Sequence, residues 1–176
     1  VAASQRFQRQ LNQFLAQIRR ETPQGQQQEE LVGKKPYSFL FAVQEPNHYQ
    51  EKLTAIKGGI NIFDTKAKVI RAALVMSACL NAWPVQDLMT GDLAVAQMNL
   101  SSGVTLYVAS VYADGKQAAI SRKLKELVNR AKREKAEVLI MGDLNSHSEE
   151  LWNDKKTDDR GREWEDVVLN LSLIHI

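Results

Sequence analysis

The sequence predicts a layered α/β (α+β) domain, in which helices cover a mixed β-sheet. Short apolar runs that stop at turn-forming residues are typical of buried strands. Other segments repeat apolar residues at helical spacing, which is typical of helices that pack on a sheet. A hairpin-like connection at 99–103, between two strand candidates, favours a mixed sheet over a purely parallel one.

Periodicity and turn residues divide the chain into successive elements. In chain order we predict a helix at 4–20, a polar glutamine-rich loop at 24–30, strands at 38–44, 68–78, 93–100 and 104–112, a helix at 117–135, a strand at 137–141, and a helix from Arg160 through Val168. Ser4 is a suitable N-cap for the first helix. The strand at 38–44 is almost continuously apolar, whereas the strand at 104–112 is rich in Val, Thr and Tyr.

The composition is ordinary for a soluble globular protein and excludes several classes of protein. The 176 residues are 44% hydrophobic and 25% charged, enough to bury the core of a single domain. The single Cys79 rules out an internal disulfide framework and a cysteine-based zinc site, and its apolar surroundings predict a buried thiol. Apolar stretches are too short for a bilayer span, and no secretion signal is visible, so we expect no membrane partner.

Polar side chains follow three of the predicted strands, at the point where each strand ends. Glu45 follows the first strand, Tyr112 closes the fourth, and Asp143 and Asn145 follow the strand at 137–141. Such strand ends aim side chains from a rigid core. Glu45 could ligate Mg²⁺, Asp143 could hold an attacking water, and Tyr112 and Asn145 could donate hydrogen bonds to a phosphate. These are the parts that metal-dependent phosphodiester cleavage needs.

The same residues also have a purely structural interpretation. An Asp-x-Asn sequence after a strand often forms an Asx-turn, in which the side chain bonds nearby backbone. Spacing alone gives the turn and the catalytic interpretation about equal weight, so both stay open at this point.

The order of the motifs resembles a known superfamily. The segments AVQEP at 42–46, SVYA at 110–113 and MGDLNSHS at 141–148 are similar to the successive signatures of the endonuclease/exonuclease/phosphatase superfamily. More narrowly, they resemble the apurinic-type endonuclease domain of non-LTR (LINE-type) retrotransposons. The features that point to this subgroup are RAALV at 71–75, LNAW at 80–83, Trp152, and TDDRGR at 157–162. The similarity covers about residues 39–169.

The resemblance implies a fold, a site and a biological setting. The fold would be a four-layer sandwich of two mixed β-sheets flanked by helices. The family's metal-binding Glu falls on Glu45, its phosphate-contacting Tyr on Tyr112, and its Asp and Asn pair on Asp143 and Asn145. The cofactor would be Mg²⁺, with Mn²⁺ as an alternative. The partners would be DNA and the reverse-transcriptase domain of the same polyprotein, and the domain would nick chromosomal DNA in the nucleus.

Three further residues are candidates for DNA contacts. His147 follows the Asp143-x-Asn145 turn, and we assign it a structural or DNA-contacting role in preference to catalysis. Arg160 and Arg162 could meet phosphates, although a turn and a helix start explain them nearly as well.

The chain departs from the family pattern at both ends. The family's opening strand with an Asn near the metal, and its closing Ser-Asp-His motif, have no counterpart in the sequence. We therefore expect residues 1–170 to be a fragment of one domain, incomplete at both ends and inactive alone. Residues 171–176 resemble the translated read-through of a sequencing adapter, so His175 is left out of the site.

Two rival functions follow from the same pattern. One is a phosphatase of the same superfamily that acts on phosphoinositides or sphingolipids, which the segments at 71–73 and 157–162 disfavour. The other is a noncatalytic nucleic-acid-binding module that keeps the scaffold without a working metal site.

Overall fold

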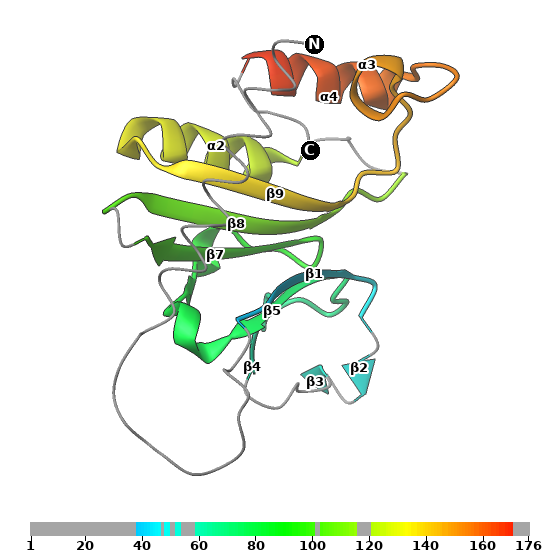
Figure 1. The fold of residues 1–176 in the computed structure, drawn as a ribbon. Coiled ribbons are helices and arrows are strands. Elements are labelled where there is room, and N and C mark those ends of the chain that lie inside the picture. The colour runs from blue at the N-terminus through cyan, green and yellow to red at the C-terminus, as the bar shows by residue number, and fades with distance from the viewer. Residues whose placement is uncertain are drawn as a thin grey trace, which may run out of the picture.

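Two β-sheets lie one above the other, with the helices beyond the larger sheet (Figure 1). The computed structural model describes residues 38–46, 48–49, 52–53, 59–100, 103–115 and 121–170. The strands are β1 (Leu40–Gln44), β2 (His48–Tyr49), β3 (Lys52–Leu53), β4 (Gly59–Ile62), β5 (Ala72–Ser77), β6 (Trp83–Pro84), β7 (Leu93–Asn99), β8 (Thr105–Tyr112) and β9 (Glu137–Asp143). The helices are α2 (Arg122–Glu134), α3 (Glu149–Trp152) and α4 (Asp159–Asn170), with 3₁₀ turns η1 (Ala78–Leu80) and η2 (Gln86–Leu88).

The smaller sheet has the order β1-β5-β4, and its neighbours are antiparallel. The larger sheet has the order β6-β7-β8-β9, in which β6, β7 and β8 pair antiparallel and β8 pairs parallel with β9. The strands β2 and β3 form a separate short antiparallel pair. The described residues thus contain one mixed sheet, one three-stranded antiparallel sheet and one short antiparallel pair.

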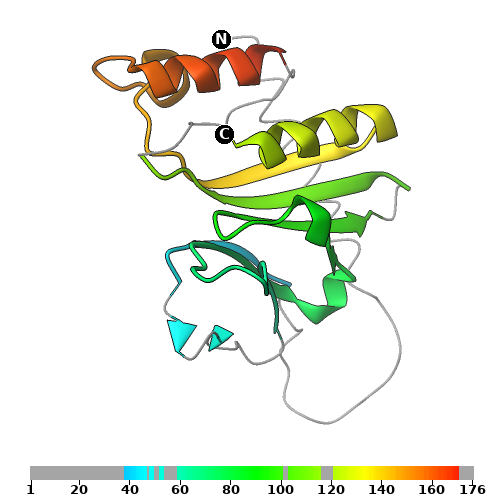
Figure 2. The same cartoon turned by 180° about the vertical axis from the view of Figure 1, so that it is seen from behind.

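Helix α2 connects the two parallel strands β8 and β9, as a parallel pair requires a crossover. Ser121 caps its start, because its hydroxyl oxygen accepts a hydrogen bond from the N–H of Leu124 at 3.1 Å. Lys135 ends it in the left-handed conformation. Its apolar residues, which face the protein interior, are Leu124, Leu127, Val128 and Ala131. Seen from behind, α2 again lies over β9, with α3 and α4 farther out (Figure 2).

The hydrophobic core fills the space between the two sheets and continues between the larger sheet and the helices. All six residues of β5 are buried, as are five of the seven residues of β7 and six of the eight residues of β8. Because successive side chains of a strand point to opposite faces, this burial means that both faces of the central strands are covered. The cluster includes Leu74, Met76, Val95, Val108 and Trp164. The core therefore holds β1 and β5 against β7 and β8, and it fixes where the strand ends lie.

The predicted elements from residue 38 onward are confirmed, with shifted limits. The strand expected at 68–78 begins only at Ala72, because the preceding residues form turns and bends. The short strands β2, β3, β4 and β6 and the helix α3 were not predicted. The prediction that Cys79 is buried is wrong, since it lies exposed in η1.

Several expectations fall on residues outside the described ranges. These are the helix at 4–20, the loop at 24–30, the first residues of the helix predicted at 117–135, and the tail at 171–176. The described residues form three of the four expected layers, namely two sheets and one helical layer. None of the helices in the described segments is long and apolar enough to cross a lipid bilayer.

Tyr107 gives a test of the contact between β8 and α2. Its side chain is buried, and its hydroxyl donates a 2.5 Å hydrogen bond to Glu134 on α2. We expect Tyr107→Phe to lower the free energy of unfolding by about 1–2 kcal/mol, because a hydrogen bond to a charged group is lost. Urea denaturation at neutral pH measures this. An unchanged unfolding midpoint would show that the hydroxyl contributes nothing.

The same residue predicts a pH dependence of stability. Burial, and then the hydrogen bond to Glu134, raise the pKa of Tyr107 from 10.0 to about 12. A raised pKa means that the stabilisation is complete below pH 10, where the phenol is neutral in both states. It is lost as the pH rises toward 12, because the unfolded state releases the proton first. The difference in stability between the native protein and Tyr107→Phe should therefore shrink between pH 10 and 12, as urea denaturation across that range would reveal.

Candidate functional site

The ends of β1 and β8 are joined across the two sheets by a buried hydroxyl. Ser110, which is fully buried in β8, accepts a 3.1 Å hydrogen bond from the side-chain amide of Gln44. Its own hydroxyl donates to the backbone carbonyl of Val43 at 3.4 Å. These contacts place the last residues of β1 over the last residues of β8. As a result, Glu45 comes next to Tyr112.

Glu45 stands in a bend directly after β1, with its side chain exposed. Its φ of 46° lies in the left-handed region, which non-glycine residues adopt rarely and often at functional positions. The backbone N–H of Glu45 donates a 2.8 Å hydrogen bond to the carbonyl of Arg71, which holds this turn in place. The carboxylate is therefore presented to solvent from a fixed backbone.

Tyr112 is the last residue of β8 and neighbours both Glu45 and Asp143. Its partner in the parallel register is Asp143, the last residue of β9. Its backbone N–H donates to the carbonyl of Asp92 at 2.9 Å. Partial burial raises the pKa of Tyr112, and the negative charge of the neighbouring Glu45 raises it further. The phenol is thus neutral at physiological pH and can donate a hydrogen bond.

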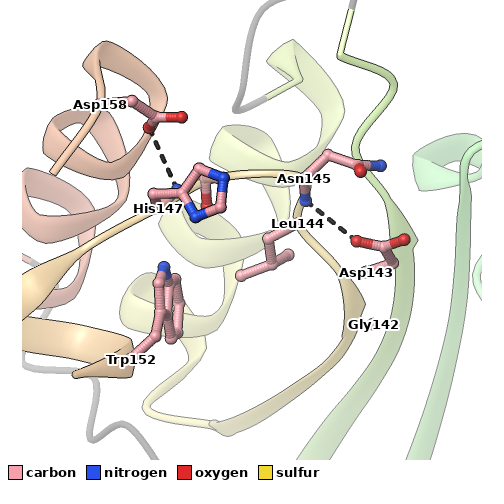
Figure 3. Close-up of a pocket in the computed structure, with 8 residues that line it drawn as sticks. Gly142, Asp143, Leu144, Asn145, His147, Trp152 and Asp158 are labelled. Carbon is pink, nitrogen blue, oxygen red and sulfur yellow. Dashed lines mark hydrogen bonds between the residues drawn. The ribbon is translucent and has the colours of Figure 1, made fainter. Parts of the chain in front are cut away.

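Asp143 and Asn145 form the turn that follows β9. The N–H of Asn145 donates to Oδ1 of Asp143 at 3.0 Å, so the Asx-turn considered from the sequence is present. This turn orients the carboxylate without consuming its second oxygen, and it is compatible with a catalytic role. Figure 3 shows the side chains of Asp143 and Asn145 near the end of β9, His147 farther along the loop, and Trp152, which belongs to α3, near His147.

Glycine is required where β9 meets β8 at this turn. Gly142 has a φ of 156°, and a Cβ at this position would lie 1.9 Å from the carbonyl oxygen of Val111. The missing side chain lets the end of β9 approach β8 closely. That approach places Asp143 beside Tyr112 in the register.

His147 lies farther along the loop, in an open pocket of about 560 Å³ that Asp143, Asn145, Trp152 and Asp158 also line. Its imidazole is mostly exposed, and Nδ1 lies 3.3 Å from a carboxylate oxygen of Asp154. The backbone N–H of His147 donates to Oδ1 of Asp158 at 3.2 Å, and its carbonyl accepts from the N–H of Asp158 at 3.0 Å. The contacts with Asp154 and Asp158 agree with a structural role, while DNA contact stays a prediction.

Asp158 also fixes the start of α4. Its Oδ1 accepts a 2.6 Å hydrogen bond from the N–H of Gly161, and the hydrogen bonds from Gly161 and His147 lower the pKa of this carboxyl group. A Cβ on Gly161 would lie 1.8 Å from the carbonyl oxygen of His147. The first turn of α4 therefore packs directly on the loop that carries Asn145 and His147.

The two arginines predicted as DNA contacts have protein partners. Arg160 donates from Nε to the carbonyl of Asn145 at 2.9 Å and from Nη2 to the carbonyl of Ala113 at 3.1 Å. It therefore bridges the residue after Tyr112 and the Asx-turn. Arg162 is exposed and pairs with Asp159, and it also donates to the carbonyl of Thr157 at 3.3 Å. The sequence did not predict these contacts of Arg160, and DNA contact by either arginine stays a prediction.

The sequence also did not predict the network of charged residues around Arg71. The Arg71 guanidinium contacts Asp92 and Asp114, and it lies over the ring of Tyr112. The hydrogen bond to Asp92 is the main cause that raises the pKa of Arg71 above its usual range. The segment at 71–75 belongs to the motifs noted in the sequence, but nothing in the sequence indicates which acids Arg71 would meet.

The donor set at the strand ends suits a magnesium ion that stays largely hydrated. Mg²⁺ prefers oxygen ligands, and one or two carboxylates with several waters are sufficient. Glu45 offers an exposed carboxylate, and Asp143 ends a neighbouring strand. The described residues contain no group of three or more His, Cys, Asp or Glu that could hold a metal ion. Glu45 is thus the residue that would hold a magnesium ion.

Comparisons with known proteins agree with this geometry. Residues 106–176 match the family described as "Endonuclease-reverse transcriptase". This confirms the resemblance to retrotransposon endonucleases for the part of the chain that carries Tyr112, Asp143 and Asn145. A search of curated proteins found no match.

The fold is similar to that of a solved nuclease. The structure titled "Endonuclease domain of TRAS1, a telomere-specific non-LTR retrotransposon" matches with a TM-score of 0.59 and 19% sequence identity. The match covers 75% of this chain and 57% of the chain of that structure. At this identity the likeness establishes the fold. The expected α/β sandwich with two sheets and helices is therefore confirmed at the level of the fold.

Gly161 gives a test of how α4 supports the loop. We expect Gly161→Ala to lower the free energy of unfolding by about 2 kcal/mol or more, because the new methyl group would overlap the backbone of His147. The matched control is Gly115→Ala, since among the described residues no atom beyond the chain neighbours lies within 4 Å of a Cβ at that position. Thermal unfolding of both variants is the measurement. Equal stability of the two variants would contradict the close packing of α4 on the loop.

Proposed function

Because residues 106–176 match the endonuclease-reverse transcriptase family, we propose that this chain is part of a Mg²⁺-dependent DNA endonuclease domain of a non-LTR retrotransposon. The observation that carries the proposal is the convergence of three strand ends. Glu45 lies beside Tyr112, and Tyr112 pairs in register with Asp143. A scaffold that places a carboxylate, a phenol and a second carboxylate at one edge suits phosphodiester chemistry.

Each residue has a role in the proposed cleavage. Glu45 holds the metal ion, which neutralises charge on the phosphate when bound. Asp143 orients the attacking water, or removes its proton, through the carboxylate that the Asx-turn holds. The amide of Asn145 and the neutral hydroxyl of Tyr112 donate hydrogen bonds to the phosphate oxygens. Arg160 supports these groups by tying the turn to the end of β8.

The biological setting extends the same proposal. The domain would nick chromosomal DNA in the nucleus, and the freed 3′-hydroxyl would prime reverse transcription by a polymerase domain of the same polyprotein. We also infer the four-layer sandwich for the whole domain, in which a further helical layer covers the β1-β5-β4 sheet. The chain spans 57% of the solved TRAS1 chain, so we expect the 176 residues alone to nick DNA slowly or not at all.

A nicking assay tests the proposed site. In the longer domain that contains this chain, Glu45→Ala and Asp143→Ala should each lower the rate of supercoiled-plasmid nicking in Mg²⁺ by roughly 100-fold or more, because each removes a group that acts on the reacting phosphate or water. The control is Glu137→Ala, which removes an exposed carboxylate at the opposite end of β9. It should leave the rate unchanged.

The outcome also separates the rival functions. Undiminished nicking by both site variants would rule out this centre. Hydrolysis of phosphoinositides without nicking would favour a phosphatase of the superfamily. DNA binding without Mg²⁺ and without cleavage, with a steep dependence on salt, would favour a noncatalytic module.

A further inference from the structure

We infer that Arg71 is a positioning residue: its guanidinium holds Tyr112 in place together with Asp92 and Asp114, while its backbone carbonyl holds the turn at Glu45. Arg71 comes directly before β5, a strand that contributes none of the proposed catalytic groups. The consequence for cleavage rests on the proposed function, whereas the positioning of Tyr112 can be measured without activity.

The Arg71 guanidinium forms ion pairs with two carboxylates. Its Nε and Nη2 donate to the two oxygens of Asp92 at 2.6 and 2.8 Å, and its Nη1 donates to Asp114 at 2.6 Å. An arginine has five N–H donors, so three are used inside the protein. The side chains of these three residues are only 21–27% exposed. A cation balanced by two close carboxylates is a poor phosphate ligand, which favours positioning over contact with DNA.

The same guanidinium restrains the ring of Tyr112. Its Cζ lies 5.2 Å from the ring centroid, within the range of a cation–π contact. Asp114 follows Tyr112 by two residues in the sequence. The Arg71–Asp114 ion pair therefore restrains the backbone directly after Tyr112. The phenol is therefore held from its face and from its own backbone.

Main-chain hydrogen bonds of Arg71 also restrain the turn that contains Glu45. The carbonyl of Arg71 accepts the 2.8 Å hydrogen bond from the N–H of Glu45, whose backbone is in the left-handed region. The N–H of Arg71 donates to the carbonyl of Gly91 at 2.7 Å. The N–H of Tyr112 donates to the carbonyl of Asp92, the residue whose side chain holds Arg71. One residue thus links the ends of β1 and β8.

A lysine at position 71 cannot form the contacts that Arg71 forms. An ammonium group is a point charge that cannot form the planar two-atom contact with Asp92, reach Asp114 and lie flat on the ring at once. Arg71→Lys should therefore keep the charge and lose the geometry. Arg71→Gln loses both.

The first experiment observes Tyr112 directly in the 176-residue chain. Ring signals of ¹³C-labelled tyrosine are recorded by NMR, and the Tyr112 signals are assigned by their loss in Tyr112→Phe. We expect Arg71→Lys and Arg71→Gln to shift the Tyr112 signals and leave those of Tyr107 in place. The matched control is Arg130→Gln, because Arg130 has a similarly exposed side chain, 22% against 27%, and a two-point contact with Asp87 away from the strand ends. Arg130→Gln should leave Tyr112 unshifted.

The second experiment measures nicking by the longer domain that contains this chain. Arg71→Lys should lower kcat by roughly 10-fold and change KM by less than about twofold, because the groups are misplaced while substrate binding is kept. The double variant Arg71→Lys with Tyr112→Phe should be no slower than the slower single variant, since both changes act through one phenol.

The NMR experiment tests the positioning role of Arg71, and the nicking experiment also tests the proposed function, so the two can be contradicted independently. Unshifted Tyr112 signals in both Arg71 variants, or an equal shift in Arg130→Gln, would overturn the positioning role whatever the domain's activity. If no nicking is seen in the native domain, the proposed function fails and the NMR result still decides the role of Arg71. A rise in KM with unchanged kcat would mean that Arg71 binds DNA itself, contrary to the inference.

Discussion

The parallel pairing of β8 with β9 is the constraint on which the candidate site depends. It sets Tyr112 opposite Asp143, and it requires the crossover helix α2, whose apolar side covers the sheet. Gly142 makes the pairing possible to its last residue, because the strands come too close there for a side chain. A shift of the register by one residue would turn Asp143 toward the opposite face of the sheet and remove it from Tyr112.

Two arginines add contacts that hold the paired strand ends together, and neither is among the proposed reacting groups. Arg71 fastens the end of β8 to the turn after β1, and Arg160 fastens the same end to the turn after β9. Tyr112 and the residues just after it therefore form the common point of three strand ends. Catalysis by fixed dipoles and charges gains from such support, because the groups need little rearrangement when the reaction occurs.

Much of this arrangement could be predicted from the sequence, because it depends on local patterns of apolar and polar residues. Apolar runs followed by polar residues identified Glu45, Tyr112, Asp143 and Asn145 as neighbours at strand ends. The contacts of Arg71 could not be predicted, since Asp92 and Asp114 lie 21 and 43 residues away and leave no periodic trace. The strand β4, Gly-Ile-Asn-Ile, is too short to stand out until β5 pairs with it.

The contacts between His147 and Asp158 have a practical consequence. Two backbone-mediated hydrogen bonds between these residues close the base of the excursion that contains α3. Ser148 and Glu165 anchor its inner half, while Asn153, Lys155 and Lys156 at the tip are exposed. A loop closed at its base can change length or composition at small entropic cost. The tip is thus a natural place to insert foreign segments without disturbing the strand ends that carry the candidate site.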